Sequence, residues 1–267
     1  MRQVNWKRLC SGLAIALVLV VLLSCGLLNA LNYHTPLYSG KPASQWRDDL
    51  MSGDASRSNH ARQIIASEVL PQLSGEAQST NSDSSLTVAV VEQLNELPFI
   101  HVRWASAAAR RSEAVVEIGN FGQMATNSVP LLIRLVRGSE SGLHVAAVTA
   151  LGQIHSDAAV VVPLLIECLK NEELADCAAE SLGEYGSLAR EAIPQLLPLL
   201  SARDKEIRRG ATLAIPKIDR EAATHYGITD QQIKMLMLDP AVYDQIAARK
   251  AELRKKKAAA SSLSSGH

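Results

Sequence analysis

The sequence predicts an all-α protein, an α-solenoid of helix pairs preceded by an N-terminal transmembrane helix. Three observations support this prediction. Of the 267 residues 47% are apolar, but only 3 Trp, 5 Tyr and 2 Phe are present, and this composition favours helices packed through small side chains. A glycine recurs at a nearly constant spacing, and a proline follows it each time at the same interval. A long apolar stretch near the N-terminus contains no charge.

The uncharged stretch, residues 9–31, is predicted to be a single-pass transmembrane anchor. As a helix it is about 35 Å long, which exceeds a hydrocarbon core of about 30 Å. Arg2, Lys7 and Arg8 precede it without any acidic residue. Because positively charged flanks stay inside, we expect residues 1–8 in the cytoplasm and the rest of the chain in the periplasm or outside.

A second interpretation of the same stretch rests on Cys25. Leu22, Leu23 and Ser24 before it resemble the lipobox of bacterial lipoproteins, in which the signal ends before a cysteine that becomes lipidated. The apolar stretch continues beyond Cys25, which favours the transmembrane helix. Both interpretations attach the chain to a membrane surface.

The segments after the anchor differ in composition. Two prolines and a glycine predict a juxtamembrane linker over residues 32–43. An irregular helical region is predicted over 44–101, with a serine-rich loop over 74–85. Three further segments are predicted: repeats over 102–219, C-terminal capping helices over 220–258 and a disordered tail over 259–267.

The internal repeat decides the predicted fold. The repeated positions are Gly119, Gly152 and Gly183, with Pro130, Pro163 and Pro194 following them. Glycine just past a helix adopts the left-handed conformation that closes its last turn, and proline is favoured in the first turn of the next helix. One repeat is therefore predicted to be two short helices joined by a tight loop. Pro216 replaces the glycine in a fourth repeat, where we expect the array to end.

The repeat also carries a family resemblance. The sequence AAESLGEYGSLAREAIPQLLPLL, Ala178 to Leu200, resembles the HEAT repeat, and the spacing is similar to the short HEAT-like repeats named after phycobilisome lyases. The preceding GKPASQW, Gly40 to Trp46, is similar to membrane-anchored HEAT-repeat proteins of bacteria. These resemblances imply a solenoid of HEAT-like helix pairs that binds other proteins along its surface.

The charge balance and the missing motifs argue against nucleic-acid binding and against the common catalytic and metal sites. The 27 basic and 27 acidic residues balance, so no attraction to nucleic acid is predicted. The sequence lacks a phosphate-binding glycine loop, HExxH, GxSxG and paired CxxC motifs, so we assign no catalytic, cofactor or metal residues. Whether Cys168 and Cys177 are bonded stays open at this point.

The predicted function is a non-catalytic scaffold for a protein partner, tethered outside the cytoplasm by insertion of residues 9–31 into the lipid bilayer. Exposed positions of the second helices are expected to form the partner-binding face; they are Arg134, Arg137, Glu167 and Lys170. The alternative, by analogy with the phycobilisome-lyase repeats, is a lyase-type enzyme or enzyme subunit.

Overall fold

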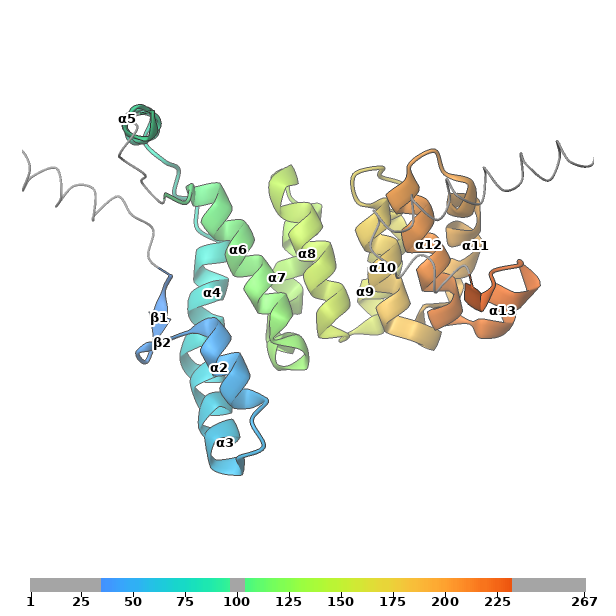
Figure 1. Cartoon of the computed structure of the whole chain (residues 1–267), viewed down its shortest axis with the longest axis horizontal. Coiled ribbons are helices and arrows are strands. Elements are labelled where there is room, and N and C mark those ends of the chain that lie inside the picture. The colour runs from blue at the N-terminus through green and yellow to red at the C-terminus, as the bar shows by residue number, and fades with distance from the viewer. Residues whose placement is uncertain (1–34, 97–103, 232–267) are drawn as a thin grey trace, which may run out of the picture. The chain divides into compact units, whose positions relative to one another are not determined.

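The computed structural model describes residues 35–96 and 104–231 (Figure 1). These residues are helical apart from one short hairpin and the connecting loops, which confirms the all-α prediction for the described chain. They form two compact lobes, and the boundary falls after Glu117. No helix in the described ranges is long and apolar enough to span a membrane. The predicted anchor 9–31, Cys25 and the tail 259–267 lie outside these ranges.

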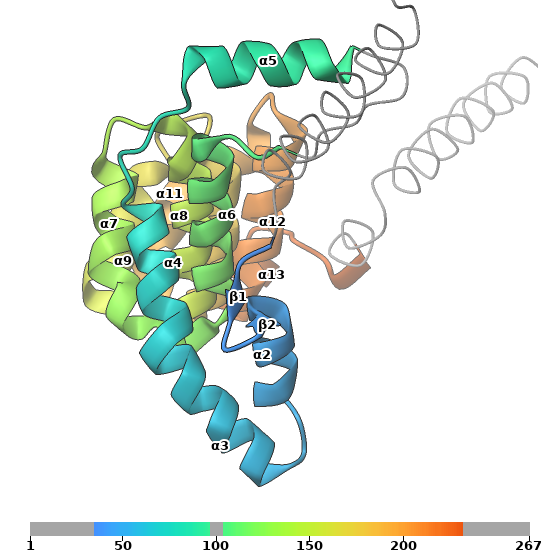
Figure 2. The same ribbon diagram turned by 90° about the vertical axis from the view of Figure 1, so that its left-hand side faces the viewer.

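The N-terminal lobe begins with a tight hairpin. Its elements are β1 (Leu37–Tyr38), β2 (Lys41–Pro42), α2 (Ala43–Leu50), α3 (Ala55–Ile64), η1 (Ile65–Val69), α4 (Leu70–Ala77), α5 (Ser85–Asn95) and the first part of α6 (Ala107–Asn120). Figure 2 shows α3, η1 and α4 as one continuous helix, and η1 is a π-helical turn within it. Asp54 caps the start of this helix through the amides of Ser56 and Arg57.

Two predicted boundaries change in this lobe. The stretch 32–43, expected to be a linker, contains the hairpin, whose turn places Ser39 and Gly40 at positive φ values of 45° and 82°. Helix α4 continues to Ala77, so the serine-rich loop predicted over 74–85 begins later than expected. Leu70, Leu73 and Ala77 are buried along one side of α4, and this packing extends the helix into the polar sequence.

The C-terminal lobe consists of stacked helix pairs. Its elements after α6 are η2 (Gly122–Ser128), α7 (Val129–Arg137), α8 (Ser141–Ile154), α9 (Ala158–Cys168), α10 (Ala175–Tyr185), η3 (Gly186–Ala192), α11 (Ile193–Leu196), η4 (Leu197–Ser201), α12 (Lys205–Ile218) and α13 (Arg220–His225). The first helices of successive repeats, α8, α10 and α12, pack side by side (Figure 1). The lobe is therefore a helical repeat built on the predicted period.

The repeated glycines act differently from the prediction. Gly119, Gly152 and Gly183 lie inside α6, α8 and α10, and none of them has a positive φ, so their assignment as left-handed helix ends is wrong. Each lies against the first helix of the next repeat instead. A Cβ at Gly152 would come within 2.9 Å of the Cα of Ser181, and one at Gly183 within 3.0 Å of the Cα of Ala214. The repeat requires glycine because two helix backbones meet there.

The left-handed residues come three positions later. Gly122, His155 and Gly186 all have φ of 54°, and each follows a buried side chain at the end of the first helix or directly after it. These side chains are Phe121, Ile154 and Tyr185. The left-handed residue thus comes three positions after the glycine that marks the repeat. In one of the three repeats this residue is a histidine, His155, instead of a glycine.

The prolines follow the prediction in two repeats of three. Pro130 and Pro194 lie in the first turns of α7 and α11. Pro163 lies within α9, because that helix already begins at Ala158, whereas the other two repeats have the 3-10 segments η2 and η3 at this place. The second helix therefore starts at different points in the repeats, although the proline register is constant.

Candidate functional site

The predicted partner-binding residues are all exposed. Arg134 and Arg137 lie on α7, Glu167 on α9, and Lys170 just after the end of α9. Arg134 and Glu167 occupy equivalent positions in two repeats, as do Arg137 and Lys170. The structure thus places them on the surface, on second helices or directly after one, and their role in partner binding stays a prediction.

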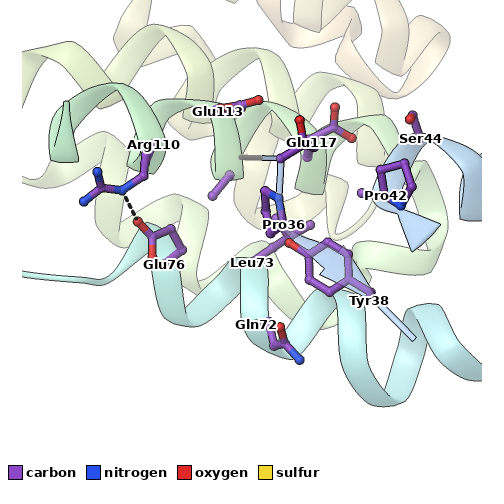
Figure 3. Close-up of a pocket in the computed structure, with 13 residues that line it drawn as sticks. Pro36, Tyr38, Pro42, Ser44, Gln72, Leu73, Glu76, Arg110, Glu113 and Glu117 are labelled. Carbon is purple, nitrogen blue, oxygen red and sulfur yellow. Dashed lines mark hydrogen bonds and ion pairs between the residues drawn. The ribbon is translucent and has the colours of Figure 1, made fainter. Parts of the chain in front are cut away.

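A pocket that the sequence did not indicate lies within the N-terminal lobe. It has a volume of about 350 Å³ and is formed by the hairpin, the start of α2, α4 and α6 (Figure 3). Its lining residues are Thr35, Pro36, Tyr38, Pro42, Ala43, Ser44, Gln72, Leu73, Glu76, Arg110, Glu113, Ala114 and Glu117. The volume is at the lower end of the range of about 300–1,000 Å³ typical of small-molecule sites.

The pocket has apolar walls and acidic side chains. Pro36, Pro42 and Leu73 supply much of the apolar surface, whereas α6 contributes Glu113 and Glu117 one helical turn apart. Glu76 from α4 brings the carboxylates to three, against the single guanidinium of Arg110. The lining therefore carries an excess of negative charge.

Two ion pairs hold parts of this lining. The Nε of Arg110 lies 3.3 Å from the Oε1 of Glu76, as the dashed line in Figure 3 shows, and this pair joins α6 to α4. The Nη1 of Arg47 lies 3.4 Å from the Oε2 of Glu117 and joins α2 to α6. Both pairs are partly exposed, so they contribute more to the geometry than to the stability of the lobe.

Tyr38 lies at the centre of the labelled side chains in Figure 3 and is only 3% exposed. Burial raises the pKa of Tyr38, and the carboxylates of Glu117, Glu76 and Glu113 raise it further. The hydroxyl therefore remains protonated at neutral pH.

Trp46 fixes the hairpin that carries Tyr38. The indole Nε1 donates a 2.7 Å hydrogen bond to the carbonyl oxygen of Tyr38, and the side chain is 2% exposed. The Nζ of Lys41 lies 4.6 Å from the centroid of the Trp46 ring, in a cation–π contact. At the turn, Ser39 donates from its amide and its hydroxyl to the carboxylate of Glu68 on η1, at 2.8 and 2.5 Å. The GKPASQW segment is thus a clamp that shapes the pocket wall.

Asp49 closes this clamp from α2. Its Oδ2 accepts a 2.7 Å hydrogen bond from Lys41, and its Oδ1 accepts one from the guanidinium of Arg57 at the start of α3. These two hydrogen bonds lower the pKa of Asp49 below its ordinary value. The charged carboxylate therefore stabilises the fold above its ordinary pKa of about 4, and this contribution is lost as the pH falls from there through the lowered pKa.

We expect Asp49→Asn to reduce the stability that the lobe loses when the pH is lowered. The wild-type protein should lose more stability between pH 7 and pH 3 than the variant, because only the wild type protonates this carboxylate. The measurement is the urea midpoint at both pH values, with exposed Asp48→Asn as the matched control. Equal acid losses in the wild type and Asp49→Asn would show that Asp49 does not contribute.

The two cysteines of the C-terminal lobe are free thiols. Cys168 and Cys177 are both buried and unbonded, and the Sγ of Cys177 donates to the carbonyl oxygen of Leu174 at 3.2 Å. Burial raises the pKa of Cys168 to about 11 and that of Cys177 to about 12. Because the thiolate is the reactive form, neither side chain is suited to nucleophilic chemistry at neutral pH.

Metal-binding side chains do not converge in the described ranges. No group of three or more His, Cys, Asp or Glu side chains is placed there to hold a metal ion. The carboxylates of the pocket are instead distributed between α4 and α6 and partly paired with arginine.

Comparison with known proteins gives short or distant matches. No protein-family model matches the sequence. A stretch of 77 residues, 28% of this chain, is 32% identical to the uncharacterized protein SkfG of Bacillus subtilis (strain 168), and the match spans 45% of that protein. The chain thus covers less than half the length of this relative.

Two solved structures are similar at low identity. One is the complex of CpcE and CpcF of phycocyanin lyase from Nostoc sp. PCC7120, with a TM-score of 0.47, 17% identity, and coverage of 80% of this chain and 76% of that chain. The other is an engineered protein, with a TM-score of 0.38, 18% identity, and coverage of 78% and 56%. In the residues that the structure describes, the protein is a mostly helical repeat protein whose N-terminal lobe carries an acidic, apolar-walled pocket.

Proposed function

We propose that this protein is a non-catalytic, membrane-tethered scaffold that binds a protein partner outside the cytoplasm. The observation that carries the proposal is the pocket of the N-terminal lobe, which combines apolar walls with acidic side chains from two helices. Such a pocket recognises a group presented by another molecule. It contains no activated nucleophile and no metal-ligand cluster within the described residues.

The position of the pocket along the chain supports the tether as part of the function. Thr35 and Pro36 line the pocket, and they follow the last residue of the proposed anchor, Leu31, by four and five positions. An extended chain of four residues spans about 14 Å. A helix anchored through residues 9–31 therefore keeps the pocket close to the membrane surface, where it meets a partner in or on the same membrane.

The alternative, an enzyme of the phycobilisome-lyase type, receives less support from this pocket. A linear tetrapyrrole carries two carboxylates, and the three glutamates of the lining oppose such a ligand. The volume of about 350 Å³ is also small for a chromophore of that size. We therefore propose that the chain has no enzymatic activity.

The tether has its own test. We expect the full-length protein to sediment with membranes and to show its unprocessed N-terminal peptide in mass spectrometry. Protease added outside spheroplasts should digest the repeats. Deletion of residues 9–31 should release it, whereas Cys25→Ser should change nothing. A lipidated N-terminus at Cys25 would replace the helix by a lipid anchor, and a soluble full-length protein would contradict both.

Partner binding is tested by photo-crosslinking in intact cells. A photoreactive amino acid replaces Gln72 at the pocket, Lys170 on the second-helix face, or Gln195 on α11 as a matched exposed control. The expected result is a discrete adduct of one mass at Gln72, at Lys170 or at both, and none at Gln195. Adducts at none of the positions would contradict the scaffold. Reversing the charges of Arg134, Arg137 and Lys170 together then shows whether that face contributes.

A further inference from the structure

Helix α9 is apolar on its outer side as well as on its inner side. Glu167 is its only charged residue. The other outer residues are exposed or half-buried, and they are Ala159, Val160, Pro163 and Ile166. Val160 alone is 54% exposed. A helix at the surface of a protein usually carries polar side chains on its outer side, so the composition of α9 is typical of a face that another molecule covers.

Helix α7 continues this apolar face into the preceding repeat. Pro130 and Ile133 of α7 precede Pro163 and Ile166 of α9 by 33 residues each. Pro130 is exposed and Ile133 is half-buried, as are their counterparts in α9. Helix α7 packs on α8, α9 packs on α10, and α8 lies beside α10, so the two second helices lie in one layer (Figure 2). Together they form an outer patch, which consists of Pro130, Ile133, Ala159, Val160, Pro163 and Ile166.

Two cations border the outer patch where these helices end. Arg137 and Lys170 occupy equivalent positions one repeat apart. Both are exposed, and neither forms an ion pair with another residue that the structure describes. Acidic residues stand nearby without pairing with either cation, and they are Glu140, Glu167, Glu172 and Glu173. The two cations are therefore available to carboxylates of a ligand that covers the patch.

The side chains of the patch decide the conformation of that ligand. Proline, isoleucine, valine and alanine offer no hydrogen-bonding group. An extended segment docked there would bury amide and carbonyl groups without partners, which is costly. An α-helix bonds these groups internally and presents side chains three and four residues apart on one face. The patch is therefore suited to a helix that lies across α7 and α9.

A lipid surface fits the outer patch less well. Helices that lie in the membrane interface carry Trp, Phe or Leu on the inserted face. The patch contains none of these, and Ile133 and Ile166 are half-buried, so little apolar volume protrudes. Glu167 on the same side of α9 also opposes an anionic bilayer.

We propose that the outer patch binds an amphipathic helix of the protein partner. This inference rests on the proposed function as a protein-binding scaffold and names the chemistry of its recognition. The apolar side of the partner helix covers Val160 and Pro163 and reaches Pro130, while acidic residues along one edge pair with Arg137 and Lys170. The partner segment therefore has apolar residues three and four positions apart and Asp or Glu on one flank of that stripe.

The test is photo-crosslinking of the full-length protein in intact cells. A photoreactive amino acid replaces Pro130 or Val160 in the patch, or Val145 on α8 as the matched control, because Val145 is 46% exposed but lies outside the patch. We expect adducts of one mass at Pro130 and Val160 and none at Val145. Sequencing of the crosslinked peptides should place both attachment points on one segment of the partner, three, four or seven residues apart, as on one face of a helix.

A matched pair of substitutions tests whether the apolar face carries the binding. Val160→Asp places a carboxylate in the patch, and the yield of the Pro130 adduct should fall at least about tenfold, equal to about 1.4 kcal/mol. Val145→Asp, at a valine of similar exposure, should leave that yield unchanged. Changing the acidic flank of the mapped partner helix to lysine should lower the yield, and Arg137→Glu together with Lys170→Glu should then restore it.

Three results would each overturn the proposal: attachment points two residues apart, adducts with lipid or with a second copy of this chain, or an unchanged yield in Val160→Asp. An adduct at Gln72 without one at Val160 would leave the scaffold intact and remove only the helix-binding patch.

Discussion

Trp46→Ala should lower the free energy of unfolding by about 4 kcal/mol, since removing a buried tryptophan typically costs about 3–5 kcal/mol. The side chain is 2% exposed, and its loss leaves a cavity between the hairpin and α2. It also removes the 2.7 Å hydrogen bond to the carbonyl oxygen of Tyr38 and the ring beneath Lys41. The hairpin then loses its attachment, and the pocket wall with it.

The measurement is urea unfolding of the full-length protein in detergent, followed by circular dichroism. Met51→Ala in the same segment is the control, because Met51 is 80% exposed and its change should stay within about 0.5 kcal/mol. Trp46→Phe fills most of the space but cannot donate to Tyr38, and we expect an intermediate cost of about 2 kcal/mol. If Trp46→Ala and Met51→Ala cost the same, the clamp does not stabilise the lobe.

Gly152→Ala should destabilise the protein by about 2 kcal/mol although alanine is the better helix former, because overpacking of a close contact typically costs about 1–3 kcal/mol. The added Cβ would lie 2.9 Å from the Cα of Ser181 and 2.5 Å from its Oγ. Helices α8 and α10 must then separate. This separation weakens the 3.1 Å hydrogen bond from the Ser181 hydroxyl to the carbonyl oxygen of Val148.

The same helix supplies the control. Gly142 also lies on α8, but a Cβ there meets nothing within 4 Å. Gly142→Ala should therefore stabilise the protein by about 0.5 kcal/mol through helix propensity alone. Opposite signs of the two changes in thermal unfolding would establish the backbone contact. A stabilising Gly152→Ala would mean that the repeats do not approach as closely as the structure shows.

The repeat can be predicted because its physical requirement recurs at a fixed period. The positions of the glycines follow from the sequence but their role does not, since a helix end and a close approach both require the absence of a Cβ. The neighbours that decide between these roles, Ala150, Ser181 and Ala214, lie on the following first helices. A single sequence shows how often such contacts recur, but it does not show which residues of the next helix each glycine meets.

The pocket could not be predicted, because its residues are far apart in the sequence and follow no period. Thr35 and Glu117 line the same cavity, and Arg47 reaches Glu117 across 70 positions. The hairpin falls in the predicted linker because each strand has only two residues, too few for an alternating pattern. GKPASQW is the signal that the sequence offers, since it supplies the turn, the cation and the tryptophan of the clamp.

The polar contacts between successive helices also set an order of assembly during synthesis. Arg110 bonds Glu76 across 34 positions, and Ser181 bonds Val148 and Lys217 bonds Glu184 across 33 each. A ribosome adds about 5–20 residues per second, so each helix waits about 2–7 s for the partner that completes its packing. A short sequence separation between contacting residues favours rapid folding. The chain can therefore fold from its N-terminus onward, with each repeat protected by the next one to emerge.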